Sequence, residues 1–282
     1  MKSAKAYSPA HITGFFMAFK NGSTGAGVNL AEGVSTKVIA KKSAWKKVSI
    51  LINGKKTPAE TSRKVVEKYL SAKKENWNVQ VFHSTKIPIG YGLGASGAGA
   101  FSLSIALNEA LGTGYSKKQV MEIAKQAEIE AGTGLGDVVA QQFHGVIIGL
   151  PPFPSTKAHL ISGGNKHVVC GFFGPIKTKK VLDNKKLLKQ INQAGKFCMQ
   201  KIHEKKTIER FLELSGFFTL SSGLATKEVK KAMKEIPQSA QSMLGNTVFV
   251  ITNSPKKVKK QMKKFCKNIL VSKIAGKGAR IL

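Results

Sequence analysis

Cysteine is scarce in this chain of 282 residues. Cys170, Cys198 and Cys266 are unevenly spaced and form no C-x-x-C pair. Such a set supports neither a disulfide framework nor a structural zinc site of the usual spacing. Unpaired thiols are typical of a reducing compartment, so we expect a cytoplasmic protein.

Long hydrophobic runs are also missing. No apolar stretch approaches the roughly 20 residues that a membrane-spanning helix needs. The most suspicious N-terminal segment, residues 12–19, is interrupted by Thr13 and Gly14 and lacks a small-residue cleavage site, so it does not fit a secretory signal. We therefore expect this segment to belong to the fold, and we expect no membrane partner.

Acidic residues are few. The chain has 15 Asp and Glu against 46 Lys and Arg, which gives a formal net charge of +31. This is far above the magnitude of roughly 2–8 found for small soluble domains and favours anionic partners. Almost all the basic residues are lysines, which bind as hydrated point charges rather than as planar forks. Because no base-reading motif accompanies them, nucleic-acid binding stays an alternative and not the favoured function; a solvated lysine surface explains the charge equally well.

The hydrophobic pattern indicates a mixed fold. Strand-like and helix-like segments follow one another without strict alternation, which predicts an α+β class. Pro151, Pro152 and Pro154 mark the most credible boundary, so we expect two lobes, residues 1–150 and 151–282. We expect strands at 34–40, 48–52, 79–83, 145–150, 167–173 and 247–252, and helices at 61–74, 100–111, 117–131, 183–203, 206–221, 227–234 and 255–267.

The most informative segment is rich in glycine and reads Pro88-Ile-Gly-Tyr-Gly-Leu-Gly-Ala-Ser-Gly-Ala98. Glycines let backbone amides converge on an anion, and the helix expected next adds the positive end of its dipole, so we predict a phosphate site. A tight turn before a core helix is the alternative, but it needs fewer glycines. Residues 92–97 match G-x-G-x-x-G, yet the acidic residue that a dinucleotide fold requires is missing. No Gly-Lys-Ser/Thr follows, which excludes a Walker loop.

This segment resembles the central motif of the GHMP kinase superfamily, P-x-x-x-G-L-G-S-S-A-A, from which Ala95 and Gly97 depart. Within the superfamily the chain is most similar to the archaeal pantoate kinases, through residues 9–16, 22–28 and 134–138. Residues 242–249 resemble the third superfamily motif. The resemblance implies a two-lobed fold, with an ATP-binding N-terminal lobe like domain 2 of ribosomal protein S5 and a ferredoxin-like C-terminal lobe.

The resemblance also implies a reaction. Such kinases use ATP and Mg²⁺ on a small-molecule hydroxyl, here the 4-hydroxyl of pantoate on the archaeal route to coenzyme A. Another GHMP-type kinase, acting on a homoserine-like or mevalonate-like alcohol, is the nearest alternative, and the N-terminal signatures argue against it. We further expect a homodimer. The motif assigns ATP binding to Gly90, Gly92, Leu93, Gly94, Ala95, Ser96, Gly97 and Ala98.

Asp137 is the candidate catalytic residue. It lies beside a second glycine loop at 132–136 and is one of two aspartates in the chain. A carboxylate there could orient the acceptor hydroxyl and take its proton, or it could cap the next helix. The residues alone leave both roles open, and the resemblance favours the catalytic one.

Glu128 and Glu130 end the helix expected at 117–131. Negative charge at a helix C-terminus opposes the dipole and indicates a compensating cation. By resemblance, Glu128 and the motif residue Ser96 are Mg²⁺ ligands, while Glu130 is solvated. The structural alternatives are that Lys125 pairs with either glutamate and that Ser96 only caps the following helix.

The acceptor contacts are expected near the N-terminus. Many superfamily members carry P-G-K where this chain has Pro9-Ala10-His11, so His11 is the candidate for the place of the missing lysine. Ser23, Thr24 and the amides of Gly25 to Gly27 could cradle a carboxylate such as that of pantoate, or they could form a hairpin turn.

Overall fold

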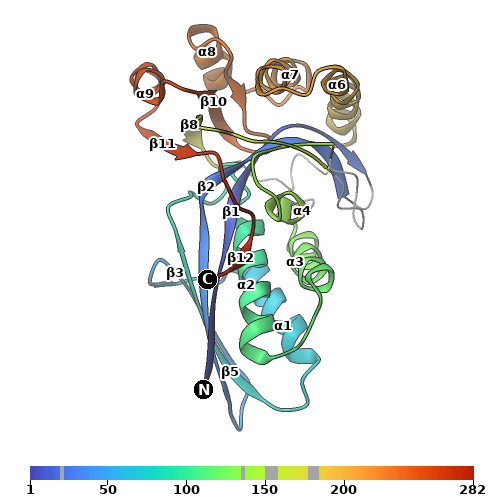
Figure 1. The fold of residues 1–282 in the computed structure, drawn as a ribbon, viewed down its shortest axis with the longest axis vertical. Helices are drawn as coiled ribbons and strands as arrows, with labels where there is room; N and C mark the ends of the chain where they lie inside the picture. Colours follow the sequence, from blue (N-terminus) through green and yellow to red (C-terminus); the bar gives the residue numbers. More distant parts are fainter. Residues whose placement is uncertain (20–21, 135–136, 150–157, 177–183) are drawn as a thin grey trace.

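The computed structural model describes residues 1–19, 22–134, 137–149, 158–176 and 184–282. Two sheets, each with its own helices, follow one another along the long axis of the molecule (Figure 1). The expected α+β class is confirmed. The proline boundary predicted at residues 151–154 lies outside the described residues.

The first sheet, sheet A, has eight strands in the order β12-β1-β2-β5-β3-β4, with β6 paired to β2 and β7 paired to β6. Because β7 and β12 follow residue 150 in the chain, the division into residues 1–150 and 151–282 stays a prediction. The bounds of the strands are β1 (Lys2–Phe19), β2 (Gly22–Lys42), β3 (Lys47–Ile52), β4 (Lys55–Lys56), β5 (Trp77–Thr85), β6 (Val146–Ile148), β7 (His159–Ile161) and β12 (Arg280–Ile281).

Strands β1 and β2 form a long antiparallel hairpin that reaches both lobes. Their register runs from Lys2 opposite Ala40 to Phe19 opposite Gly22, with irregularities at Pro9/Ala10 and Thr13/Phe15. The N-terminal apolar segment, residues 12–19, is therefore the second half of β1, in keeping with its assignment to the fold. Its buried residues pack against helices of the second lobe.

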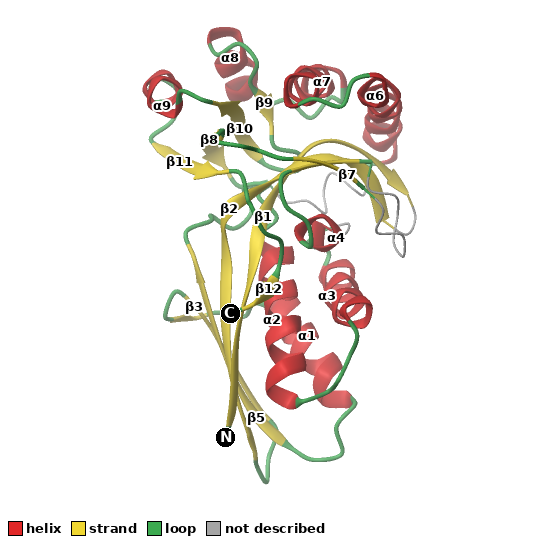
Figure 2. Ribbon diagram, in the orientation of Figure 1, coloured by secondary structure: helices red, strands yellow, loops and turns green. Residues whose placement is uncertain are grey.

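Four helices belong to the first lobe: α1 (Glu60–Ser71), α2 (Ala95–Leu111), α3 (Lys117–Ala131) and α4 (Asp137–Gln141). The first three cover one face of sheet A (Figure 2). Helix α2 packs directly on β1 and β2 and is buried along most of its length. The sequence predicted a start at residue 100, but α2 begins at Ala95, so the last glycines of the motif lie inside the helix.

The second sheet, sheet B, has the order β11-β8-β10-β9 with every neighbouring pair antiparallel. In sequence order this is 4-1-3-2, the arrangement of a ferredoxin-like lobe, as the resemblance implied. Its elements are β8 (His167–Gly174), α6 (Lys185–Glu204), α7 (Ile208–Ser221), α8 (Lys227–Glu235), β9 (Ala240–Gln241), β10 (Asn246–Thr252), α9 (Pro255–Met262) and β11 (Asn268–Lys273).

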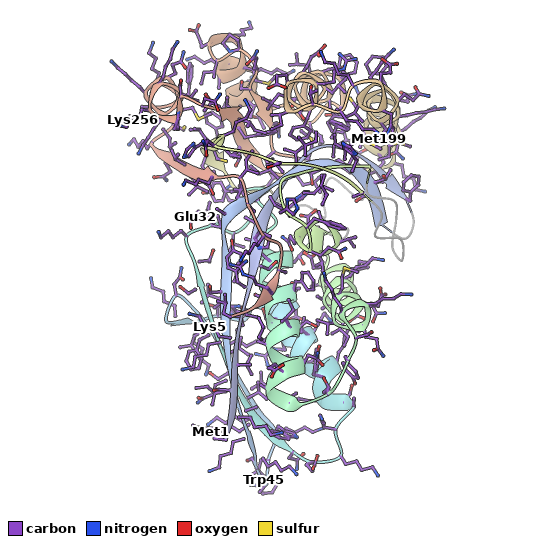
Figure 3. All side chains as sticks on the ribbon, in the orientation of Figure 1. Met1, Lys5, Glu32, Trp45, Met199 and Lys256 are labelled. Atoms are coloured by element: carbon purple, nitrogen blue, oxygen red, sulfur yellow. The ribbon has the colours of Figure 1, made fainter. Side chains whose placement is uncertain are left out.

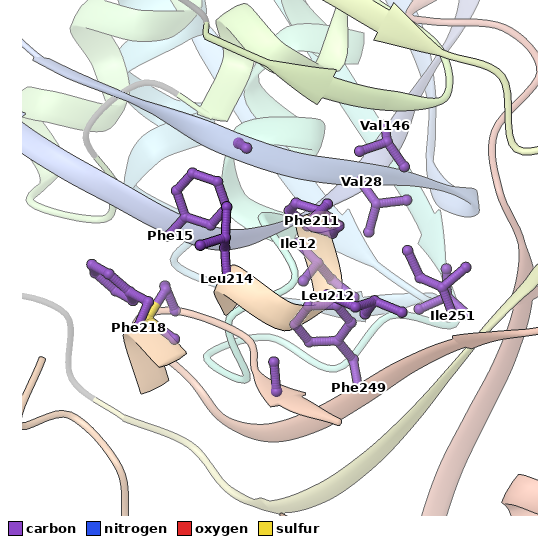
Figure 4. Close-up of a cluster of buried hydrophobic side chains, with 14 of the residues drawn as sticks. Ile12, Phe15, Val28, Val146, Phe211, Leu212, Leu214, Phe218, Phe249 and Ile251 are labelled. Atoms are coloured by element: carbon purple, nitrogen blue, oxygen red, sulfur yellow. The ribbon is translucent and has the colours of Figure 1, made fainter. Parts of the chain in front are cut away.

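The two faces of sheet B bury alternate residues, as strand geometry requires. Phe249 and Ile251 point into the cluster that joins the lobes, together with Ile12 and Phe211 (Figure 4). Val248 and Val250 instead pack beneath α8 and α9. The final helix is shorter than the 255–267 predicted, because the chain leaves α9 after Met262 and enters β11.

All three cysteines are free and buried. Among the helices in the described parts of the chain, none combines the length and apolar character needed to cross a bilayer.

Candidate functional site

The glycine motif forms a tightly turned loop that leads into the N-terminus of α2. Gly90, Gly92 and Gly94 have φ values of +87°, +81° and +59°, in the left-handed region that glycine adopts at no steric cost. Gly94 is the N-cap of α2, and the amide of Ala98 donates to its carbonyl oxygen at 2.9 Å. Helix geometry leaves the amides of residues 95–97 without acceptors in the helix. This helix end therefore offers backbone amides to an anion, and the binding of phosphate there stays a prediction.

The second lobe holds this loop in place. The hydroxyl of Ser242 donates to the carbonyl oxygen of Gly92, and Thr247 Oγ1 donates to that of Tyr91 at 2.7 Å. A Cβ on Gly92 would lie 2.8 Å from Cα of Gly245, so only glycine fits there. Residues 242–249, which resemble the third superfamily motif, thus contact the central one.

A cavity of about 380 Å³ lies against this loop. Leu93, Glu128 and Asp137 line it, so residues from α2's approach, α3 and α4 meet at one place. Further predicted residues on its lining are Ser23, Gly90, Gly92, Gly94, Ala95 and Ser96. His11, Thr24, Gly25, Gly97 and Ala98 are not part of the lining.

Glu128 lies in the last turn of α3 and is 1% exposed. Its Oε2 atom has no hydrogen-bond partner among the described residues. Burial, and then the neighbouring carboxylate of Asp137, raise the pKa of Glu128 well above its ordinary value. A buried carboxylate oxygen that lacks a partner beside an anion site fits Mg²⁺, which proteins hold through one or two carboxylates together with phosphate oxygens and water.

Glu130, by contrast, lies on the surface of α3. Its carboxylate accepts from Lys68 Nζ of α1 at 2.7 Å. An exposed pair of this kind contributes little to stability and leaves Glu130 outside the cavity.

Ser96 belongs to a cluster of three hydroxyls that sequence reasoning missed. Ser96 Oγ lies 3.1 Å from both Thr61 Oγ1 and Thr133 Oγ1, so its one proton is donated to one of them and it accepts from the other. Because the N-cap of α2 is Gly94, the interpretation of Ser96 as a helix cap is wrong. The cluster orients the Ser96 hydroxyl at the cavity, two residues from the helix end.

Asp137 begins α4 and lines the cavity. Its Oδ2 lies 3.2 Å from where a Cβ on Gly94 would be, so the carboxylate closely approaches the phosphate loop. Burial raises the pKa of Asp137 above its ordinary value, and the nearby imidazole of His11 opposes this shift. A partly exposed carboxylate of raised pKa beside an anion site is suited to accept a proton near neutral pH.

His11 is buried behind Asp137. Asn29 Nδ2 donates to the carbonyl oxygens of Ala140 and Phe143 at 2.9 and 2.8 Å, so its Oδ1 accepts from Nδ1–H of His11 at 2.8 Å. Burial lowers the pKa of His11, against the raising effects of Asp137 and Asn29. The neutral ring is 4% exposed, so His11 is placed to support Asp137 and not to line the cavity.

The segment expected to form a second anion cradle has a different backbone. Residues 22–28 are extended in β2 and pair with β1, and residues 26–28 also pair with β6. Gly25 to Gly27 are therefore ladder residues and not a loop of converging amides. Their close packing explains the glycines, since a Cβ on Gly27 would lie 2.4 Å from the His11 ring. Ser23 alone of this group reaches the cavity.

Gln141, at the end of α4, is another residue that the sequence did not reveal. Its Nε2 donates to the Gly94 carbonyl oxygen at 2.9 Å, and it is fully buried. A buried glutamine near a short helix carries no sequence signal that separates it from an ordinary core residue. It braces the phosphate loop from the side of Asp137.

Comparisons with known proteins agree with this geometry. Residues 60–145 match the family described as GHMP kinases N terminal domain. The chain is 34% identical to a pantoate kinase of Methanocaldococcus jannaschii over 258 residues, which cover 87% of this chain and 92% of that protein.

Solved structures share the fold. A phosphotransferase related to the CoA biosynthesis pathway superposes with a TM-score of 0.86 at 24% identity, over 99% of this chain and 98% of that one. A complex of MDDEF with MVAPP, AMPPCP and magnesium superposes with a TM-score of 0.73 at 14% identity, over 100% of this chain and 99% of that one.

Proposed function

The chain belongs to the pantoate kinase family of GHMP kinases, and from this premise we propose that it transfers the terminal phosphoryl group of ATP to the 4-hydroxyl of pantoate. The product, 4-phosphopantoate, is the intermediate that coenzyme A biosynthesis of this type requires. The enzyme is an ATP-dependent small-molecule kinase.

One observation carries the proposal. The N-terminus of α2 and the carboxylates of Glu128 and Asp137 border a single cavity, although they come from three separate segments. Phosphoryl transfer needs positioning and charge stabilisation more than covalent chemistry, and this cavity offers both.

Different residues bind the phosphates of ATP and the Mg²⁺ ion. The amides at the start of α2 and the loop from Gly90 to Gly94 bind the phosphate oxygens of ATP. Glu128, with the hydroxyl of Ser96, would hold Mg²⁺, which neutralises charge on the phosphates when it is bound. No lysine or arginine lies among the described residues of the cavity lining, so backbone amides carry most of the protein's share of this task.

Asp137 handles the acceptor. Its carboxylate accepts a hydrogen bond from the hydroxyl of pantoate and takes the proton as the oxygen attacks. His11 stays neutral and buried, and Asn29 fixes its tautomer, so His11 is a buried neighbour of Asp137 and not a contact of the acceptor. Ser23, which also lines the cavity, is our candidate contact for the carboxylate of pantoate.

The test combines an acceptor panel with one substitution. Purified protein with ATP and Mg²⁺ should phosphorylate pantoate, and it should use homoserine, mevalonate and shikimate far more slowly. Asp137→Asn should lower kcat by about 10²–10⁴-fold, because it removes the proton acceptor, while the affinity for ATP stays within about twofold.

Two results would contradict the proposal. Preference for homoserine or mevalonate would assign another acceptor to the same cavity. Absence of ATP turnover, together with nanomolar nucleic-acid affinity at physiological salt, would favour a basic binding protein that has kept the fold.

We also propose that the enzyme is a cytoplasmic homodimer. The three buried free thiols support a reducing compartment. Light scattering on the purified protein should give twice the chain mass of 30.3 kDa, and a single chain mass would contradict the dimer.

A further inference from the structure

A second hollow lies on the other side of the phosphate loop from the cavity that binds the substrates. Its volume is about 490 Å³, and it is bordered by Pro88 and Tyr91 of the glycine segment, Phe172 of β8, and the chain that leads from α9 into β11. Nothing in the proposed reaction uses this hollow. Its size lies within the range of sites for small organic ligands.

The charge of this hollow is of one sign. Lys86, Lys259, Lys263 and Lys267 line it, and no aspartate or glutamate does. Among the described residues, none of these four lysines has a carboxylate within ion-pair distance, although lysines elsewhere on the surface do. Four lysines from two lobes, without carboxylate partners in the described chain, border this one hollow, and a multiply charged anion bound there relieves the repulsion among like charges.

The hollow also contains an aromatic pair. The rings of Tyr91 and Phe172 lie with centroids 5.4 Å apart at an interplanar angle of 73°, and both side chains are half-buried. The Tyr91 carbonyl oxygen accepts from Thr247, which fixes this part of the loop. Proteins that bind nucleotides stack the flat bases on aromatic side chains and bind the phosphates through cationic groups, and this hollow has both kinds of side chain.

We propose that this hollow is a second ligand site that takes a small nucleoside carrying more than one phosphate group. The lysines bind the phosphates, and the base packs against Tyr91 and Phe172. A small ligand fits better than a nucleic acid, because the four charges surround one concave site instead of following an extended track. The site is independent of the identity of the acceptor.

Helix α9 provides a matched pair of variants. Lys259 and Lys263 border the hollow, whereas Lys256 and Lys260 have the same i, i+4 spacing but are not part of the lining. Lys256 extends from α9 at the outer end of the second lobe (Figure 3). The double substitutions Lys259→Gln/Lys263→Gln and Lys256→Gln/Lys260→Gln therefore change the net charge equally.

The probe is adenosine 3′,5′-bisphosphate, measured by isothermal titration calorimetry at about 0.15 M salt. We expect binding to the wild-type protein, at least tenfold weaker binding to the 259/263 variant, and less than a twofold change in the 256/260 variant. Thermal melts of both variants should match the wild type, since the four side chains are exposed. Inorganic pyrophosphate should bind at least tenfold more weakly than the nucleoside bisphosphate, because it lacks the ring.

Several results would overturn the proposal. Equal weakening in both variants would mean diffuse attraction by a basic surface, and an unchanged affinity in both would mean that the probe binds only at the catalytic cavity. Pyrophosphate binding as tightly as the nucleoside would refute the role of the aromatic pair. Tight binding of a single-stranded oligonucleotide, without binding of the bisphosphate, would assign these lysines to nucleic acid.

Discussion

Glu128→Gln should raise the free energy of unfolding and, at the same time, raise the Mg²⁺ concentration that the enzyme needs. Glu128 is almost completely buried, and its Oε2 has no hydrogen-bond partner among the described residues. Oε1 of Gln141 also lacks a donor there. Both oxygens lie near the position of a Cβ on Gly97, at 2.9 and 3.2 Å. When Glu128 is ionised, two acceptors therefore face the same small volume without a proton to share, in keeping with its raised pKa.

The substitution supplies the missing donor. Glutamine has nearly the same shape as glutamate, its amide nitrogen can donate to Gln141, and it carries no charge to desolvate. Leaving a buried polar group unsatisfied costs about 1–3 kcal/mol, so the free energy of unfolding without ligands should rise by about that amount. This corresponds to an increase in Tm on the order of 5 °C for a chain of this size.

The expected loss of activity comes from the same atom, Oε2 of Glu128. With a Mg²⁺ ligand removed, the Mg²⁺ concentration for half-maximal rate should rise by at least about tenfold, since even residues that only orient metal ligands cost 10–100-fold. The thermal stabilisation by Mg²⁺ and AMPPCP should shrink in parallel, because ligand binding stabilises in proportion to its affinity. Differential scanning fluorimetry and a coupled kinase assay at varied Mg²⁺ measure both quantities.

Glu130→Gln is the matched control. It lies on the same helix but is exposed and paired with Lys68, so it should change the free energy of unfolding by less than about 1 kcal/mol and leave the Mg²⁺ requirement unchanged. The reasoning is refuted if Glu128→Gln lowers Tm and keeps the Mg²⁺ requirement of the wild type. Glu128 would then be a structural partner and not a metal ligand.

Gly92→Ala should lower the free energy of unfolding by at least about 1–2 kcal/mol and reduce kcat/KM, because the φ of Gly92 is +81° and a Cβ would collide with the backbone of Gly245. The control is Gly54→Ala, at φ +77° in open space, which should leave kcat/KM unchanged in the same assay. Ser242→Ala should raise KM for ATP about fivefold, since it removes one hydrogen bond to the phosphate loop, and steady-state kinetics that show an unchanged KM would contradict this. Burial lowers the pKa of His83 from 6.5 to about 4, so the unfolded chain takes up its proton first and stability falls as pH drops from about 6.5 to about 4, by up to about 3 kcal/mol. Urea denaturation at both ends of this window should show a smaller difference for His83→Gln than for the wild type.

The sequence identified the residues of the candidate site, but not how they lie relative to one another. The glycine segment, Glu128 and Asp137 were each identified from residue type and position, and the structure brings them to one cavity. Their roles as ATP, metal and proton-handling residues stay predictions. Their convergence could not be worked out from spacing, because it depends on how α3 and α4 cross the start of α2.

Residues that act through hydrogen bonds were harder to find. Gln141 and Asn29 are ordinary buried amides in the sequence, and only the fold shows that they brace Gly94 and His11. The start of α2 was misplaced for a similar reason. Glycine favours loops by local propensity, yet Gly97 lies in the helix, where the carboxylate of Glu128 packs so closely that a Cβ does not fit.

Short strands were missed because their stability comes from partners far along the chain. Strand β12 has two residues and depends on pairing with β1, and β4 is equally short. Strand β11, with six residues, was not predicted, and the expected helix was extended to residue 267, directly before this strand, because lysines fit an exposed helix as well as the turn that precedes β11. In the second lobe, amphipathic spacing placed α6, α7 and α8 within about two residues of their observed bounds, whereas the end of α9 was predicted five residues too late.

The two lobes that border the cavity share one pair of strands, the hairpin of β1 and β2. The same two strands contact helices of the first lobe and α6 and α7 of the second, so this hairpin joins the two lobes along its length. Its register is irregular at Pro9/Ala10 and at Thr13/Phe15, and irregularities of this kind locally bend a strand and increase its twist. His11 lies between these two irregularities, so the local bend of the hairpin determines where the ring lies relative to Asp137.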